Sequence, residues 1–361
     1  MSEKKKKNPD CLAAPEVLSS SSFDGLCSHY TPVVHKLQQE IRKNFQSKKR
    51  FSDYLSKVYY EIGHKSRALK VQDCGSFLEF KLNKEKAKLY NANFCKDRLC
   101  PMCNWRRTLK IFSQVSKVMD NMPDEYEFVF LTLTVRNCSA DELADTVQTM
   151  YDGWRYLYNK NKRFKKAVQG TFRTFECTVN NNPRSLFYGT YHPHLHCTLA
   201  VKKDYFSSSD YITHEDMVEL WQNACGLDYE PIVHIEKVYL KDEDGEKQTE
   251  GIDLKKAVAE ATKYAVKSSD YLDLHNLDKS CETVQTFLSA LSGRRLCSWS
   301  GIFSKVRKQL QLDDAENGDL IYTNDDTIRD DVASLIVRYQ WKSGVYSVTK
   351  IEEESLRPCT R

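Results

Sequence analysis

The sequence predicts an α+β fold, in which a central antiparallel sheet is flanked by helices. Three segments, 127–135, 170–179 and 191–201, alternate apolar and polar residues or are rich in β-branched and aromatic residues, as strands are. Helical patterns surround them, but strands and helices do not alternate in the regular order of a parallel βαβ sheet. The 361 residues exceed what one core usually organises, so we expect a main domain of roughly 200 residues with appended segments.

The N-terminal hundred residues divide into three parts. Residues 1–35 combine a lysine run with "SSSSF" and are too polar to bury much, so we expect disorder there. Over 36–70, apolar residues recur four positions apart and predict helices. Residues 74–103 hold spaced cysteines with little periodicity, which indicates a small loop-rich module, and "GSFLEFKLNKEKAKLYNANF" within it is typical of a hairpin.

The centre of the chain begins with the segment "EFVFLTLTV", 127–135, which predicts a buried strand. It places Thr132 and Thr134 on one face of the strand and apolar residues on the other. An amphipathic helix follows, from about Ala140 to Tyr158, and "SADE" supplies a serine cap at its start.

Two strands then form a predicted hairpin, "GTFRTFECTV" and "YHPHLHCTLAV", joined across "NNNPRS". Side chains alternate between the faces of a strand, so His192, His194 and His196 share one face while the other face is apolar. Glu176 of the first strand can lie beside His194 or His196. We therefore expect core on one face of the hairpin and chemistry on the other.

The remaining pattern predicts a helix near 213–225, a strand at "PIVHIEKVYL", a charged linker at 241–250 and a helix over 252–268. Beyond about residue 310, "LDDAENGD" and "NDDTIRDD" hold eight acidic residues against one arginine. We expect this acidic extension to lie outside the functional core.

Composition limits the compartment and the class of protein. No apolar run approaches the ~20 residues needed to span a bilayer, and the charged N-terminus lacks the apolar stretch of a signal peptide. Thirteen cysteines in such a chain favour reduced thiols and a metal site over disulfides. We expect a cytoplasmic protein without membrane contact.

Two local basic patches suit single-stranded nucleic acid, although the net charge is only +4. Lysine and arginine meet phosphates while aromatic rings stack on unpaired bases. One patch holds Lys160, Lys162, Arg163, Lys165 and Lys166 beside Tyr156, Tyr158 and Phe164; the other holds Arg294, Arg295, Lys305, Arg307 and Lys308 beside Trp299 and Phe303. Solvated helix faces would give the same pattern.

The histidine strand is a candidate metal site. Two imidazoles two positions apart on a strand can bind one divalent ion and leave positions open for water or phosphate. With Glu176 as third ligand, His194 and His196 suit Mg²⁺ or Mn²⁺, although the same set could take zinc. The alternative is a set of histidines satisfied by hydrogen bonds on a partly exposed strand.

The predicted helix in "DLKKAVAEATKYAVKSSDY" places Glu260, Tyr264 and Lys267 at i, i+4 and i+7, along the edge of an apolar stripe. A tyrosine can attack a phosphodiester if a metal draws charge from the phosphate. A carboxylate one turn away can activate water, and a lysine can hold the phosphate. An ordinary amphipathic surface helix is the alternative.

The cysteines of "CKDRLCPMCNWRR", Cys95, Cys100 and Cys103, follow a C-x₄-C-x₂-C spacing, with Cys74 as a plausible fourth thiolate. Four thiolates form the usual structural zinc set. Ordinary reduced thiols remain the alternative. Arg98, Arg106 and Arg107 beside them could contact DNA.

These motifs together resemble the replication initiators of small rolling-circle plasmids, within the HUH endonuclease superfamily. "FLTLT" is similar to the first motif of that superfamily, "HLH" to the second, and "EATKYAVKSSDY" to a third motif that pairs glutamate and tyrosine and continues with lysine and aspartate, here Lys267 and Asp270. The later "FLSALSGRRLCSWSGIF" is also similar to a segment near the end of these proteins. The resemblance covers about 70–305, and similar cysteines in the family support zinc.

The resemblance implies a mechanism. His194 and His196 bind Mg²⁺ or Mn²⁺ at the scissile phosphate of the plasmid origin, and Tyr264 attacks that phosphate. Tyr264 becomes linked to the 5′-phosphate and frees a 3′-hydroxyl primer, and Glu260 later directs water in the terminating cleavage. The third metal ligand stays open between Glu176 and His192. The partners implied are double- and single-stranded origin DNA, host helicase and DNA polymerase; the oligomeric state stays open, a dimer included.

The resemblance also implies a domain order. We expect a disordered N-terminus over 1–35, a helical and Cys-rich DNA-binding module over 36–115, the catalytic domain over 120–275, the last part of the core over 276–310 and the acidic extension over 311–361. A relaxase or single-strand transposase would use the same chemistry, and a zinc-dependent DNA-binding regulator would leave the histidines inert.

Overall fold

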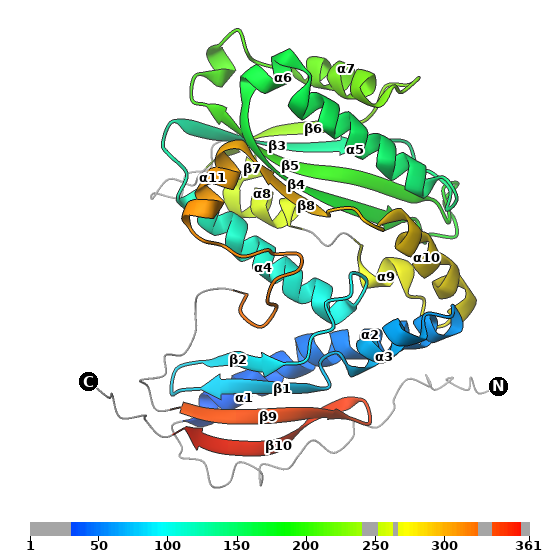
Figure 1. The fold of residues 1–361 in the computed structure, drawn as a ribbon, viewed down its shortest axis with the longest axis vertical. Coiled ribbons are helices and arrows are strands. Elements are labelled where there is room, and N and C mark those ends of the chain that lie inside the picture. The colour runs from blue at the N-terminus through cyan, green and yellow to red at the C-terminus, as the bar shows by residue number, and fades with distance from the viewer. Residues whose placement is uncertain (1–29, 240–251, 263–265, 324–333, 355–361) are drawn as a thin grey trace, which may run out of the picture. The chain divides into compact units, whose positions relative to one another are not determined.

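Residues 30–239, 252–262, 266–323 and 334–354 are described by the computed structural model in Figure 1. Contacts divide the chain into two compact units. Unit 1 combines Met1–Ser47, Gly75–Asn93 and Thr327–Arg361, and unit 2 combines Lys48–Cys74 and Phe94–Asp326. In the described ranges, no helix has the length and apolar character needed to cross a bilayer.

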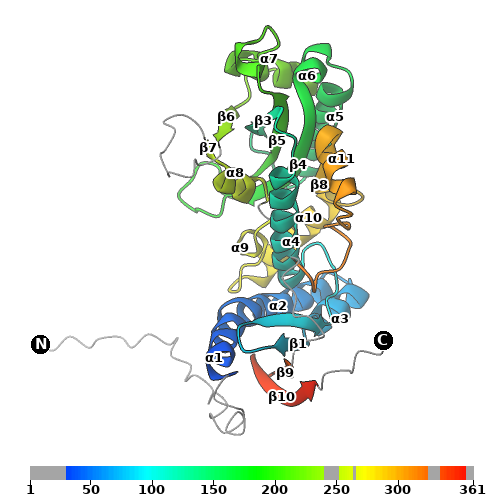
Figure 2. The ribbon, with the colours of Figure 1, turned by 90° about the vertical axis from the view of Figure 1, so that its left-hand side faces the viewer.

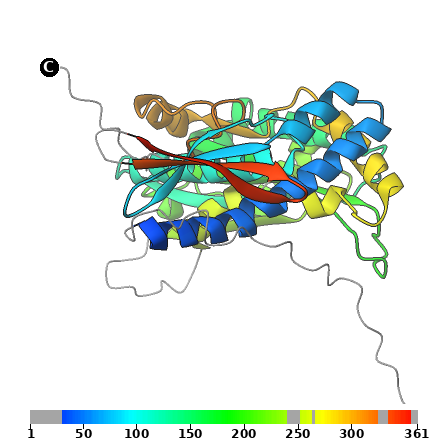
Figure 3. The same cartoon turned by 90° about the horizontal axis from the view of Figure 1, so that it is seen from below.

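Unit 1 contains a four-stranded antiparallel sheet in the order β10-β9-β1-β2 (Figure 3). Its strands are β1 (Phe77–Leu82), β2 (Ala87–Ala92), β9 (Ser334–Lys342) and β10 (Val345–Glu354). A two-residue turn joins β9 to β10, and Ser343 and Gly344 both take the positive φ of a type I′ hairpin. The hairpin expected within 74–103 is confirmed, whereas the acidic extension contains two strands that its composition did not predict.

The core of unit 1 is aromatic. Helix α1 (Thr31–Glu40) continues into a π-helical stretch (Ile41–Gln46) and buries Leu37 and Phe45. The Phe45 ring packs edge-on against Phe80 of β1, with centroids 5.6 Å apart, and Phe80 packs edge-on against Tyr339 of β9. These contacts hold the helical segment on the sheet.

Unit 2 is built on a six-stranded sheet in the order β7-β6-β3-β5-β4-β8. The strands are β3 (Tyr126–Thr134), β4 (Val168–Val179), β5 (Tyr191–Lys202), β6 (Val233–Tyr239), β7 (Ile252–Asp253) and β8 (Cys297–Ser300). All neighbours are antiparallel except β6 and β7. The α+β class with antiparallel sheets and flanking helices is therefore confirmed, as are the predicted strands at 127–135, 170–179 and 191–201.

Helices cover both faces of this sheet (Figures 1 and 2). The helices of unit 2, which include those that cover the sheet, are α2 (Ser47–Glu61), α3 (Lys65–Asp73), α4 (Pro101–Asp120), α5 (Leu143–Asn159), α6 (Lys162–Ala167), α7 (His214–Cys225), α8 (Leu254–Ala261), α9 (Ser268–Tyr271), α10 (Leu277–Ala290) and α11 (Gly301–Gln309), with a 3₁₀ turn at Tyr205–Ser207. Apolar side chains of α4, α8 and α11 form one core with Phe128, Phe130 and Phe172 of the sheet. On the opposite face, Phe175 stacks with Tyr151 of α5.

One predicted helix is wrong in its length. A single helix was expected over 252–268, but α8 ends at Ala261, and Lys267 has the extended conformation of an N-cap before the short helix α9. Residues 263–265, with Tyr264, lie outside the described residues. Lys267 is therefore not on the same helix as Glu260, so the seven-residue spacing does not place it.

Candidate active site and metal centres

The β4–β5 hairpin brings together the residues that the sequence singled out on separate strands. Its register pairs Glu176 with His194 and Thr174 with His196. The three side chains point to the same face, because they occupy alternate positions on neighbouring strands. The opposite face of β5 is buried, as the alternation predicted, with Leu195 and Leu199 in the core.

Glu176, His194 and His196 form a compact set of ligand atoms, which lie within 4.8 Å of one another. His196 Nε2 is 2.8 Å from Glu176 Oε2, and both side chains are almost fully buried. The Thr132 hydroxyl lies 3.2 Å from His196 Nδ1, and the Phe130 ring stacks on the imidazole. One carboxylate and two imidazoles suit a divalent metal ion, and Thr132 fixes the ring that would hold it.

Thr132 was not predicted to have a role at the site. The signal that could have identified it was present, because the strand pattern placed Thr132 on one face of β3. In the observed register, Thr132 pairs with His196 across β3 and β5.

His192 lies on the same strand face but outside this set. Its ring is 4.7 Å from that of His194, centroid to centroid, and it is half-buried. Burial lowers the pKa of the His192 imidazole, and the charge of Glu176 opposes that shift. Within the described residues, only Glu176 completes a close group with His194 and His196.

Lys267 lies beside the same carboxylate, a contact that the sequence did not predict. Its Nζ lies 3.8 Å from Glu176 Oε1, although Lys267 precedes α9 instead of continuing α8. Asp270 follows in α9; burial raises the pKa of its carboxyl, and Lys267 opposes that rise. The lysine thus balances charge at the edge of the candidate metal-ligating set.

Helix α8 is fixed to the β4–β5 hairpin, which carries the candidate metal ligands. Ala257, Val258 and Ala261 are buried in the sheet core, and the Thr174 hydroxyl donates to the Ala261 carbonyl at 2.7 Å. Thr174 pairs with His196, so the end of α8 lies beside the ligand strand. Glu260 directly precedes Ala261 in the sequence, and its side chain is half-buried.

The four predicted cysteines meet in unit 2. Cys74 ends α3, Cys95 lies in a loop, and Cys100 and Cys103 stand at the start of α4. Neighbouring Sγ atoms are 3.5 to 3.7 Å apart. Zn–S bonds of ~2.3 Å in a tetrahedron give a sulfur separation of about 3.8 Å, so the set fits a zinc ion. The Lys96 and Asp97 amides also donate to sulfur atoms, as they would to thiolates.

Comparison with known proteins agrees with these motifs. A family model described as "Replication protein" matches residues 86–347. The chain is 35% identical to "Protein rep" of Bacillus amyloliquefaciens over 336 residues, 88% of this chain and 96% of the relative. It is 39% identical to "Protein rep" of a Bacillus species over 265 residues, 71% of this chain and 84% of the relative. No solved structure matches the chain.

The chain belongs to this replication protein family. The resemblance to plasmid replication initiators is thereby confirmed.

In this replication protein, the cysteine loop is connected to the segment that carries Lys267. Asp97 Oδ1 accepts hydrogen bonds from the Leu99 amide, at 2.9 Å, and from the Tyr59 hydroxyl, at 2.8 Å. The Leu99 carbonyl accepts from the hydroxyl of Tyr271, which is buried at the end of α9. The position of α9 therefore depends on the shape of the cysteine loop.

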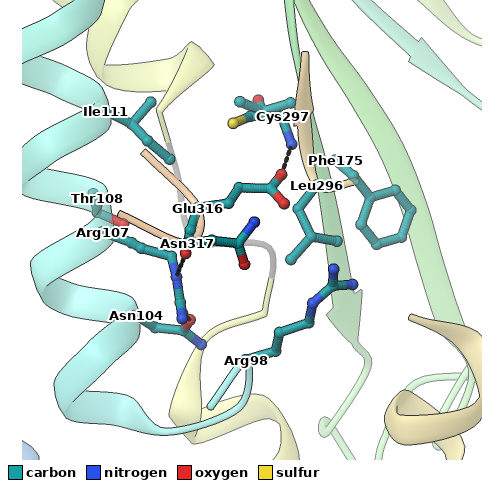
Figure 4. A pocket seen from close by; sticks show the side chains of 11 residues that line it. Arg98, Asn104, Arg107, Thr108, Ile111, Phe175, Leu296, Cys297, Glu316 and Asn317 are labelled. Atoms are coloured by element: carbon teal, nitrogen blue, oxygen red, sulfur yellow. Dashed lines mark hydrogen bonds between the residues drawn. The ribbon is translucent and has the colours of Figure 1, made fainter. Parts of the chain in front are cut away.

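Arg106 and Arg107 do not face outward for DNA, so that hypothesis is wrong for both. They are buried and hold a segment that the sequence placed in the acidic extension. Arg106 donates to the carbonyls of Leu320 and Ile321. Figure 4 shows Arg107, which donates to the carbonyl of Glu316. The Lys110 ammonium lies 2.6 Å from Asp313 in the same segment.

In the two basic patches of the replication protein, fewer aromatic rings are accessible to bases than the sequence suggested. Phe164 and Phe303 are fully buried, so they pack in the core instead of stacking on bases. Trp299 is half-buried against Phe172, with centroids 4.3 Å apart. Tyr156 remains 48% exposed, so a base could reach its ring.

Proposed function

We propose that this chain initiates rolling-circle replication of a plasmid as a metal-dependent, site-specific single-strand DNA endonuclease and strand transferase. The observation that carries the proposal is the set Glu176, His194 and His196 in a member of the replication protein family, with the end of α8 fixed beside it. The residue assignments below are part of the same proposal.

Each residue of the proposed active site has a distinct chemical role. Mg²⁺ or Mn²⁺ held by Glu176, His194 and His196 would polarise the scissile phosphate. Tyr264 attacks that phosphate, forms a tyrosyl ester with the 5′-phosphate and releases the 3′-hydroxyl. Lys267, whose ammonium is next to Glu176, contributes positive charge toward the phosphate oxygens.

Glu260 acts after one round of synthesis. Its carboxylate directs a water molecule at the terminating cleavage, so that termination needs no second tyrosine. Glu260 directly precedes Ala261, whose carbonyl accepts a hydrogen bond from Thr174. This position beside the ligand strands supports the role of Glu260.

The cysteine set has a structural part in the proposal. Cys74, Cys95, Cys100 and Cys103 hold zinc, which shapes the loop that contacts α9. The catalytic domain of the proposal is residues 120–275. Five strands of the six-stranded sheet lie within this range, which supports it. Origin DNA is the partner. A host helicase unwinds the duplex and DNA polymerase extends the 3′-hydroxyl. The compartment is the cytoplasm, where a plasmid replicates.

The deciding experiment is cleavage of an origin oligonucleotide in the presence of Mn²⁺. We expect nicking with a covalent adduct on Tyr264, identified by mass spectrometry, and no adduct with Tyr264→Phe. Nicking by Tyr264→Phe at the wild-type rate would contradict the nucleophile, and absence of cleavage by the wild-type protein would favour a DNA-binding regulator.

Termination is tested separately. Glu260→Ala should nick at the wild-type rate but fail to release the product strand. If Glu260→Ala released product normally, water would have to be directed by another residue.

A further inference from the structure

A pocket of unit 2 lies between the first turn of α4 and the segment around Lys267. Its lining includes Lys48, Asn104, Lys267, Ser268 and Ser269. These side chains offer ammonium, amide and hydroxyl donors, and none of the described residues that line the pocket is acidic. The pocket is therefore suited to an anion.

Asn104 supplies the observation that points to a ligand. Its side chain is 8% exposed, and its Nδ2 has no hydrogen-bond partner among the described residues. The Oδ1 atom accepts from Arg107 Nη1 at 2.7 Å, which fixes the amide and directs Nδ2 away from Arg107. A buried N–H₂ group without an acceptor is costly, so an acceptor from outside the chain would stabilise it.

Two further features favour negative charge in the pocket. Asn104 and Pro101, which also lines it, belong to the first turn of α4, where the helix dipole is positive. Lys48 is half-buried, and burial lowers the pKa of its ammonium because it removes solvating water. A phosphate oxygen would replace that water.

The pocket is joined to the candidate active site through one residue. Lys267 lines the pocket, and its Nζ is also 3.8 Å from Glu176 Oε1. A strand whose scissile phosphate lies at Glu176, His194 and His196 would pass the pocket with a neighbouring phosphate.

We propose that the pocket formed by Lys48, Asn104 and Lys267 binds a backbone phosphate of the single strand next to the one that is cleaved. This inference rests on the proposed function. The pocket holds the strand in register, and the metal-ligating set acts on the adjacent linkage. Because the contact is to a phosphate, it positions the strand without reading its bases.

The test is a scan of oligonucleotides that span the nick site, each with one uncharged methylphosphonate linkage. Binding is measured by fluorescence anisotropy without divalent ions. At one linkage beside the nick, we expect wild-type affinity to fall about 10-fold, because a charge-assisted hydrogen bond is lost.

Asn104→Asp is the matched variant, because it keeps the Oδ acceptor for Arg107 and replaces the N–H₂ donor with a carboxylate oxygen. It should weaken binding of the unmodified strand about 10-fold and make binding insensitive to the methylphosphonate at that linkage. Lys48→Gln should lower the slope of log affinity against log salt by about 0.7, the value for one contact to a single strand. Lys57→Gln, an exposed lysine on the same helix α2, should leave the slope unchanged.

The outcomes separate the pocket from the proposed function. A wild-type protein that nicks with Mn²⁺ but shows no sensitive linkage, or the same sensitivity in Asn104→Asp, overturns the pocket while the function stands. A sensitive linkage that disappears in Asn104→Asp supports the pocket even if nicking fails. If Asn104→Asp does not fold, an unchanged salt slope in Lys48→Gln overturns the proposal and a lower slope supports it.

Discussion

The two candidate metal sites of this protein contrast in ligands and in access. Four cysteines converge from a helix end, a loop and a helix start, and three of them are fully buried. Glu176, His194 and His196 project from two neighbouring strands, with His194 half-buried and Lys267 at the edge. Four ligands close a zinc site, whereas three leave positions open for substrate. Unit 2 therefore contains one candidate site whose ligand set is complete and another that has positions open for substrate.

The supporting elements also differ. The set of Glu176, His194 and His196 depends on the register of a hairpin, which many ladder hydrogen bonds fix. The cysteine set joins segments that have little other regular structure between Phe94 and Pro101. Loss of metal should therefore damage the fold at the cysteines and only the activity at the histidines.

The largest expected effect is that of Cys100→Ser, which removes one thiolate of the closed set. We expect the free energy of unfolding to fall by about 5 kcal/mol or more, since zinc binding is coupled to folding. Denaturant unfolding monitored by circular dichroism measures it. Cys281→Ser, a half-buried cysteine of α10 outside the set, is the control. Equal stability of the two variants would argue for ordinary thiols.

Brief dialysis against EDTA should separate the sites by kinetics. Nicking should fall to background and return with Mn²⁺, because the open site exchanges its ion, while the closed site keeps its zinc. Elemental analysis and the nicking rate are measured on the same samples. Loss of zinc with nicking intact would reverse the assignment of the two sites.

Glu176→Gln keeps the size of the side chain and removes its charge. We expect Mn²⁺-dependent nicking to fall about 100-fold, with the unfolding midpoint changed little. The rate is measured as a function of Mn²⁺ concentration. Glu127→Gln, a half-buried carboxylate of β3 paired with Lys237, is the control and should nick normally. An unaltered Mn²⁺ requirement in Glu176→Gln would exclude Glu176 as a ligand.

The smallest expected effect is at the connection between the sites. Tyr271→Phe removes the hydroxyl that donates to the Leu99 carbonyl, and we expect a loss of about 1 kcal/mol in stability. Nicking should fall a few-fold and zinc should dissociate faster, because both sites contact this connection. Tyr60→Phe, at an exposed tyrosine of α2, should change neither. Unchanged zinc dissociation in Tyr271→Phe would mean that the sites are independent.

The site was predictable where the pattern was local. Alternation on two adjacent strands was enough to place Glu176 on the histidine face, beside His194 or His196, and the observed register pairs it with His194. The contact of Lys267 with Glu176 was not predicted: the sequence pattern placed Lys267 on one helix with Glu260, but α8 ends at Ala261.

What the sequence did not predict depends on distant partners. Arg106 and Arg107 were expected to contact DNA because they are cationic, yet each of them binds at least one carbonyl in residues 316–321. Strands β9 and β10 lie in the segment that was expected to be an acidic extension, because acidic residues precede it. Phe77 pairs with Gln340 only after the whole chain between them has folded back. No local window contains both members of such a pair.

The order of synthesis gives the unit 1 sheet a consequence of its own. Strand β1 leaves the ribosome long before its partner β9, which begins at Ser334. Until then, the Phe77–Leu82 edge offers unpaired backbone groups, which invite association with other chains. The six-stranded sheet is complete by residue 300 and can fold first. A nascent chain interrupted before β9 would therefore carry a complete six-stranded sheet together with an unpaired strand edge that can bind other chains.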